Sequence, residues 1–311
     1  MRLSYDEDLV EATAFLCASG RRAGVTAAQV RGFQTERERC YSVPDLDERN
    51  AHFHRCHLTW FREWGLERLL LGMMKEFPLL QAHLDLLVWR RAIARKDEGA
   101  ELFVREDGCR NGVVALRAER FESDAAVTVL LHHEFTHLSD MLNPAFGYSP
   151  DLRLTGPVAT PQRLVRERYR LLWDATIDGR LSRAGRPVST MQEQHEQVFN
   201  SAYSFWPEEQ RRDVFARLWN NDTPQHAELL ALASDPRDLQ HALRPLPGSP
   251  CPLCKFPTFT WADPEVLLDA KSTEAIARQF PAWTPEQGIC DRCREIYDVA
   301  SRFEYPSTVV I

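Results

Sequence analysis

The sequence has no uninterrupted apolar run of the roughly 18 residues needed to cross a bilayer, so we expect no transmembrane helix. It also has no basic, apolar leader, because its first residues include four acids, Asp6, Glu7, Asp8 and Glu11. Such a start argues against a secretory signal. Repeats and low-complexity tracts are missing as well. These absences predict a globular cytoplasmic chain with no membrane partner.

An excess of positive charge is also lacking. The 38 lysines and arginines are outnumbered by 45 aspartates and glutamates, which gives a formal net charge of −7. This balance argues against a general affinity for nucleic acid. With 311 residues, of which 44% are hydrophobic, the chain is long enough for about two domains with a sizeable core.

Half of the eight cysteines have no paired spacing, and these are Cys17, Cys40, Cys56 and Cys109. We expect them to be free thiols, as in a reducing compartment. The other half form two CxxC turns made by Cys251, Cys254, Cys290 and Cys293. Four thiolates from two such turns are the donor set of a closed, tetrahedral, structural zinc site. A redox role is the alternative, but no thioredoxin-like βαβ pattern surrounds either turn.

The strongest signal for chemistry is His133-Glu134-x-x-His137, which lies inside an apolar, helix-like stretch. This spacing puts two imidazoles on one helical face with a carboxylate beside the first. Such a face can bind Zn²⁺ through two nitrogens while Glu134 acts as a general base toward water. Ser123 predicts the start of the helix, and Asn143 predicts its end. The alternative is a pair of histidines with an ordinary place in the core or at the surface.

A second helix, predicted over residues 160–184, carries Asp174 and Asp178 among apolar neighbours. An isolated buried carboxylate is costly, so it usually pairs, titrates or binds a metal. We interpret Asp174 as the third zinc ligand and Asp178 as the acceptor for the N–H of a zinc-bound histidine. The alternative is that both aspartates pair with one of three nearby arginines, Arg168, Arg170 or Arg180.

This constellation, His133-Glu134-x-x-His137 followed by Asp174-x-x-x-Asp178, resembles the gluzincin metallopeptidases. The resemblance implies that Glu134 is the general base, that the two histidines and Asp174 bind zinc, and that Asp178 orients a ligand histidine. The third ligand of that family is normally glutamate, and Asp174 is one methylene shorter. The sequence lacks the further glycine and histidine of the HExxHxxGxxH pattern, which disfavours the related metzincins.

The residues before the HExxH segment predict strands over 84–90, 101–104 and 112–121. By the same resemblance, a zincin-like domain has a small mixed sheet here, and its edge strand aligns an extended substrate. Residues 112–117 are expected to be that edge, with an ordinary packing hairpin as the alternative. The predicted fold class is therefore α+β, with a zincin-like domain.

The proline-rich stretch 244–250 predicts a linker. It divides the expected organisation into a mostly helical region over 1–80, a catalytic domain over 81–243, and a zinc-ribbon-like module over 251–311. Two residues are weaker site candidates. Asp140 is a reserve ligand or outer partner, and His195, in a later predicted helix, is a candidate donor to a transition-state oxyanion.

The sequence thus predicts a zinc-dependent peptidase with one catalytic and one structural zinc ion. Its expected partner is a peptide or protein substrate, and the C-terminal module is a candidate surface for a further protein partner. Two alternatives stay open: a non-catalytic zincin-like scaffold or adaptor, and a metal-dependent hydrolase of non-peptide amides. Glu134 favours the enzyme, because a structural site needs no base.

Overall fold

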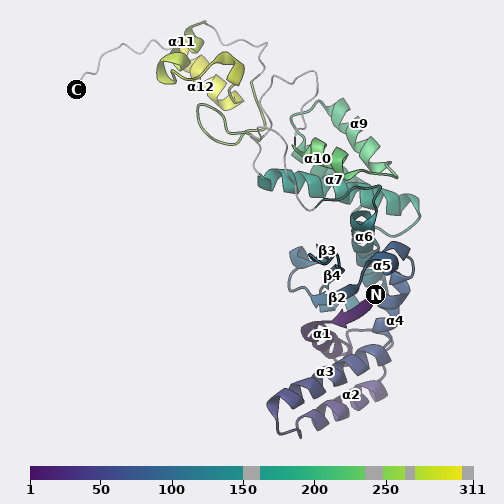
Figure 1. Ribbon diagram of the computed structural model, residues 1–311. Helices are drawn as coiled ribbons and strands as arrows, with labels where there is room; N and C mark the ends of the chain where they lie inside the picture. The colour runs from purple at the N-terminus through teal and green to yellow at the C-terminus, as the bar shows by residue number, and fades with distance from the viewer. Residues whose placement is uncertain (150–161, 235–247, 263–269, 303–311) are drawn as a thin grey trace, which may run out of the picture. The chain divides into compact units, whose positions relative to one another are not determined.

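The computed structural model describes residues 1–149, 162–234, 248–262 and 270–302, and it shows a mixed α+β chain (Figure 1). The chain divides into two compact units, Met1–Ser149 with Ile177–Met191, and Pro150–Thr176 with Gln192–Ile311. The division falls inside one helix, α7 (Gln162–Arg183). Its predicted start at residues 160–161 lies outside the described residues. In the described ranges, no helix combines the length and apolar character needed to cross a membrane.

The first unit contains a four-stranded mixed sheet in the order β1-β2-β4-β3. Its strands are β1 (Arg2–Tyr5), β2 (Leu86–Arg91), β3 (Gly99–Val104) and β4 (Arg110–Leu116). The first three in sheet order run parallel, and β3 runs antiparallel to β4. The edge prediction was wrong, because β4 is paired on both sides and β3 is the edge strand beside it. The strand expected to reach residue 121 ends at Leu116, before the 3₁₀ helix η2 (Ala118–Glu122).

Residues 1–83 are mostly helical, and they also contribute β1 to the sheet. Their helices are α1 (Glu7–Ala18), α2 (Ala27–Cys40), α3 (Leu46–Glu63), α4 (Leu66–Met74) and α5 (Pro78–His83). Helices α3 and α4 are separated at Gly65, whose φ of 75° is a left-handed conformation that favours glycine. The buried side chains of these helices form one core with those of the sheet, from Leu9 through Trp89 to Leu142.

The second unit contains the first part of α7, then α8 (Gln192–Ala202), α9 (Glu208–Trp219) and α10 (His226–Ser234), and it also includes the C-terminal module. Aromatic rings form much of its core: Phe199 stacks on Tyr203 at 4.6 Å, and Phe215 stacks on Trp219 at 6.1 Å. The hydroxyl of Tyr169 on α7 lies 2.6 Å from Nδ1 of His226. The contact between Tyr169 and His226 attaches α10 to α7.

The predicted linker, 244–250, lies partly outside the described residues. Its described end is packed, because Gly248 and Ser249 are buried and both hydrogen-bond to Thr258, at 2.6 and 3.0 Å. A Cβ atom at Gly248 would lie 2.4 Å from Leu164 Cδ2 of α7. Glycine at this position therefore permits a close approach to α7.

The C-terminal module contains α11 (Ala270–Gln279) and α12 (Asp291–Arg302), packed around Ile276, Trp283 and Ile289. The sequence predicts a zinc-ribbon-like module here. In the described part of the module, β-structure is limited to two isolated bridges, Pro250 with Pro257 and Trp261 with Cys290. Proline has no backbone N–H to donate, so this segment cannot extend the first bridge into a regular ladder.

Candidate metal centres

Helix α6 (Asp124–Leu142) carries the HExxH segment, and its bounds are those that the sequence predicts. Ser123 lies at the N-cap with an extended backbone, and Asn143 follows the last turn. Apolar residues spaced by three or four positions make the core face of the helix, and Leu131, Phe135 and Leu138 on it are fully buried. This face fixes the rotation of the helix. The side chains of the HExxH triplet are also largely buried, at 8, 8 and 9% exposure for His133, Glu134 and His137.

His133 is oriented by Asp178 of α7, whose Oδ1 lies 2.7 Å from Nδ1 of the imidazole. Asp178 is fully buried, and its Oδ2 accepts bonds from the Ser189 hydroxyl and the Thr190 backbone N–H, both at 3.3 Å. Because a carboxylate accepts at Nδ1, that nitrogen carries the proton. Nε2 then keeps its lone pair, and this tautomer of the imidazole can bind a metal through Nε2. Sequence reasoning missed Ser189 and Thr190, which lie in an irregular segment after α7.

Two histidines and one aspartate form the first candidate metal centre. Ligand atoms of His133, His137 and Asp174 all lie within 4.8 Å of one another, close enough to share one ion. The two imidazole rings are 4.9 Å apart. Arg170 approaches Asp174 at 3.8 Å, but the guanidinium is 70% exposed. Such an exposed ion pair contributes little free energy, so it does not keep the Asp174 carboxylate from binding a metal.

Glu134 faces the first residue of the edge strand β3. A Cβ atom at Gly99 would lie 3.8 Å from Glu134 Oε2. The preceding residue, Glu98, is buried and accepts bonds from Nε and Nη2 of Arg120 at 2.9 and 2.8 Å. The charge of Glu134 also acts on this arginine and helps to raise its pKa, after the hydrogen bonds from Arg120 to Glu98. A strand edge, a carboxylate and a fixed guanidinium therefore lie together beside the HExxH helix.

Glu98 gives this arrangement a testable pH dependence. Burial alone would raise its pKa, but hydrogen bonds from Arg120 and from the Arg117 backbone hold the pKa below its usual range. Such a group stabilises the folded state above its unfolded pKa, about 4.3, and this contribution is lost as pH falls through the folded pKa. We expect Glu98→Gln to lower the free energy of unfolding at neutral pH by about 1–3 kcal/mol. Denaturant titrations across pH should show the difference shrinking in acid, and a difference independent of pH would contradict this account.

The two weaker candidates have other surroundings. Both carboxylate oxygens of Asp140 accept bonds from Arg180 of α7, at 2.9 and 2.5 Å. Asp140 is not among the three donors of the histidine–aspartate centre, and its role as a reserve ligand or outer partner stays a prediction. His195 is buried on α8, and its ring lies 5.8 Å from that of Trp219. It also lies outside the centre, and its oxyanion role stays a prediction.

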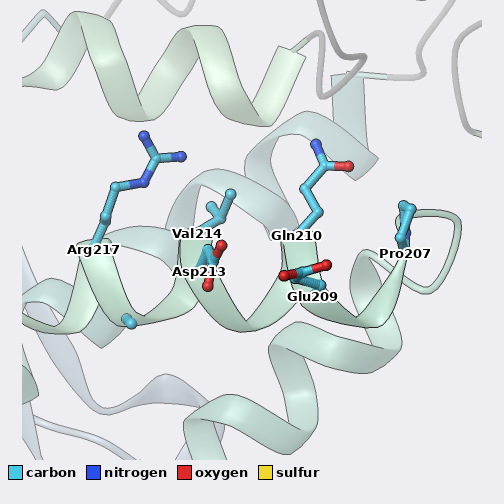
Figure 2. Close-up of a pocket in the computed structure, with 7 residues that line it drawn as sticks. Pro207, Glu209, Gln210, Asp213, Val214 and Arg217 are labelled. Atoms are coloured by element: carbon cyan, nitrogen blue, oxygen red, sulfur yellow. The ribbon is translucent and has the colours of Figure 1, made fainter.

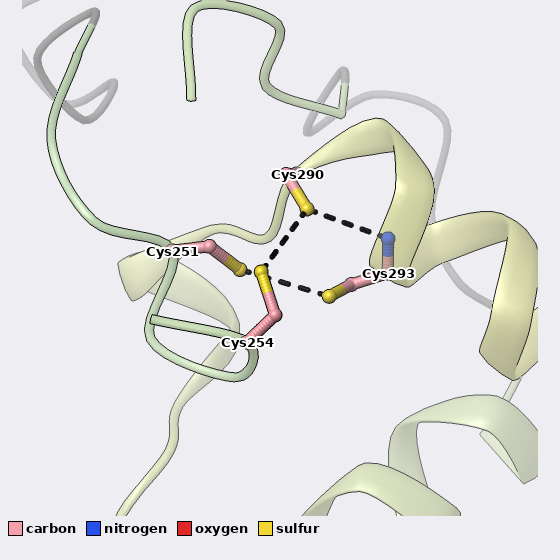
Figure 3. Close-up of side chains that lie close together, drawn as sticks. All are labelled: Cys251, Cys254, Cys290 and Cys293. Carbon is pink, nitrogen blue, oxygen red and sulfur yellow. Dashed lines mark hydrogen bonds between the residues drawn. The ribbon is translucent and has the colours of Figure 1, made fainter. Parts of the chain in front are cut away.

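Four cysteines form the second candidate metal centre (Figure 3). Cys251 and Cys293 have their sulfur atoms 3.8 Å apart, and those of Cys254 and Cys290 are 3.9 Å apart. Sulfur atoms bound at about 2.3 Å to a tetrahedral ion are about 3.8 Å from one another. The cluster therefore has the dimensions of a closed Cys₄ metal site.

The backbone around Cys251 supports this centre. Its N–H donates to Phe256 O and its carbonyl accepts from Lys255 N, both at 2.9 Å, around a left-handed Lys255 with φ 63°. Burial would raise the pKa of the Cys251 thiol, but backbone N–H groups, including those of Cys254 and Cys290, lower it to about 7. Burial and the neighbouring thiols raise the pKa values of Cys290 and Cys293, so Cys251 is the one of these three that most readily becomes a thiolate. The thiolate is the form that binds a metal. All eight cysteines lie within the described residues, and none forms a disulfide.

A separate surface pocket runs along α9, with a volume of about 810 Å³ (Figure 2). It is open to solvent and is lined by side chains of this helix, including Glu209, Asp213 and Arg217. None of its lining residues belongs to either metal centre. The pocket is therefore unrelated to the chemistry of the two centres.

Comparison with protein-family models, with curated proteins and with solved structures gave no match for this chain. The two centres are therefore the features of the chain that indicate its function. One presents His133, His137 and Asp174 as donors, with the Glu134 carboxylate next to the first of them. The other presents four sulfur donors.

Proposed function

We propose that this chain is a zinc-dependent peptidase of the gluzincin type. The observation that carries the proposal is the three-donor centre of His133, His137 and Asp174, with Glu134 next to the first histidine on the same helix. Catalytic zinc sites use three protein ligands and keep one position open, whereas structural sites use four. The two centres of this chain differ in this way, so we assign the catalytic zinc to the first and a structural zinc to the four cysteines.

The donor atoms of the first centre suit zinc. Two imidazole nitrogens and one carboxylate oxygen are ligands found in catalytic zinc enzymes. Asp178 adds support by holding the proton on Nδ1 of His133, because an outer carboxylate fixes the tautomer of a ligand histidine. When bound, Zn²⁺ lowers the pKa of water toward about 7 and polarises a scissile carbonyl.

The chain's own residues supply the proton transfers and the alignment of the substrate. Glu134 takes the proton of the attacking water and passes it to the leaving amine. Within the described residues, β3 pairs with β4 alone, so its outer edge has backbone groups available to an extended peptide. This edge begins at Gly99, beside the Glu134 carboxylate. A strand edge next to the base favours a peptide substrate over a small amide.

The proposal is tested by assaying the purified full chain with unstructured peptides. We expect cleavage that is lost when a chelator removes the metal and is restored by added zinc. Cleavage of small amides alone would identify a non-peptide hydrolase instead. A protein that binds two zinc ions and cleaves neither substrate class would be a scaffold, and the proposal would be wrong.

A further inference from the structure

Asp140 and Arg180 form an ion pair between the two helices that carry the zinc donors. Arg180 Nη1 donates to Oδ1 at 2.9 Å, and Nη2 donates to Oδ2 at 2.5 Å. The pair is mostly buried, with side-chain exposures of 20% for the guanidinium and 7% for the carboxylate. Two parallel bonds between a planar guanidinium and a carboxylate fix direction as well as distance. The pair is therefore a directional contact between α6 and α7.

Among the described residues, the ion pair is one of at least two polar contacts between these helices. Another is His133 with Asp178, and Asp140 follows His133 by seven residues on α6. At a rise of 1.5 Å per residue, this separates the two contacts by about 10 Å along the helix. One contact alone would let α7 rotate about it, whereas two fix its orientation. The helix therefore has a defined direction at Asp174, one turn before Asp178.

We propose that the Asp140–Arg180 ion pair positions Asp174 for metal binding by fixing the orientation of α7. This inference rests on the proposed function. It also explains how a short third ligand can reach the metal, because an aspartate side chain is one methylene shorter than that of a glutamate. A centre that uses aspartate tolerates less displacement of the helix behind it. Asp140 and Arg180 are thus positioning residues, and they act on the metal through Asp174.

A purely structural ion pair would behave differently. It would change the stability of the fold but leave the metal affinity of the folded protein unaltered. The chain offers a matched control at the other end of α6, where Asp124 pairs with Arg22 at 2.6 Å. Asp124 shares the helix with the ligand histidines, but it is the first residue of α6 and lies 16 residues before Asp140. Its loss should not reorient α7.

The experiment uses the full chain with Co²⁺ in place of zinc, because cobalt bound to sulfur and cobalt bound to nitrogen and oxygen absorb differently. We expect Asp140→Asn to weaken cobalt binding at the histidine–aspartate centre by about 10- to 100-fold, the usual effect of losing an outer partner. Binding at the four cysteines should not change. Asp124→Asn should leave both affinities as they are. Arg180→Lys keeps the positive charge but cannot make the two parallel hydrogen bonds to Asp140. Its cobalt affinity at the histidine–aspartate centre should therefore lie between those of the unaltered protein and Asp140→Asn.

Circular dichroism and thermal unfolding of the metal-free proteins show whether each variant is folded. Should Asp140→Asn fail to fold, Arg180→Lys carries the test. Unchanged cobalt affinity in a folded variant would overturn the positioning role and leave the proposed function standing. Cobalt bound only by sulfur in the unaltered protein would overturn the proposed function, and this inference with it.

Discussion

Glu134→Gln is expected to slow peptide hydrolysis by about 100- to 10,000-fold while both metal ions stay bound. The amide keeps the shape of the side chain, but it cannot accept the proton of water. Glu134 is not one of the three donors, so the change should spare the metal. The measurements are kcat/KM on a peptide substrate and the zinc content of the same preparation.

A matched substitution controls for this result. Glu119 is an exposed glutamate in η2, the 3₁₀ helix that precedes α6. Glu119→Gln makes the same chemical change outside the centre, and it should leave hydrolysis unaltered. Activity of Glu134→Gln within a few-fold of the unaltered protein would refute the assignment of the base.

Asp174→Ala is expected to weaken zinc binding at the histidine–aspartate centre by more than the roughly 100-fold that losing an outer partner costs. The variant removes one of three donors and the negative charge among them. The four cysteines should keep their ion. Asp174→Glu restores a carboxylate on a longer side chain, so part of the affinity should return. Competition with a chromophoric chelator measures both variants.

Asp213 provides the control for this substitution. It lies on α9 with its side chain 68% exposed, and it belongs to neither metal centre. Asp213→Ala should therefore leave zinc affinity unaltered. Equal affinity in Asp174→Ala and the unaltered protein would show that another group is the third ligand.

The sequence predicts those parts of the molecule that depend on local periodicity and spacing. The bounds and core face of α6 follow from its apolar repeat and from Ser123 and Asn143. The cysteine cluster follows from two CxxC turns, whose spacing within each turn limits where the sulfur atoms can lie. Asp174 and Asp178 stand out because carboxylates are costly among apolar neighbours.

Features that depend on pairing between distant segments could not be predicted. The position of β4 between two strands depends on how the strands assemble, and the alternation within one strand does not specify its neighbours. The partner of Asp140 depends on the crossing of α6 and α7, because Arg180 is 40 residues away in the chain. Glu98 and Arg120 meet for the same reason, across 22 residues.

The proposed function depends on zinc occupying the centre of His133, His137 and Asp174. Anomalous diffraction at the zinc absorption edge, from crystals of the full chain grown with zinc, tests it most directly. We expect two strong peaks per chain, one bounded by these three donors with Glu134 beside it, and one among the four cysteine sulfur atoms. A single peak at the cysteines, with the histidine–aspartate centre empty in zinc-saturated crystals, would contradict the proposed function.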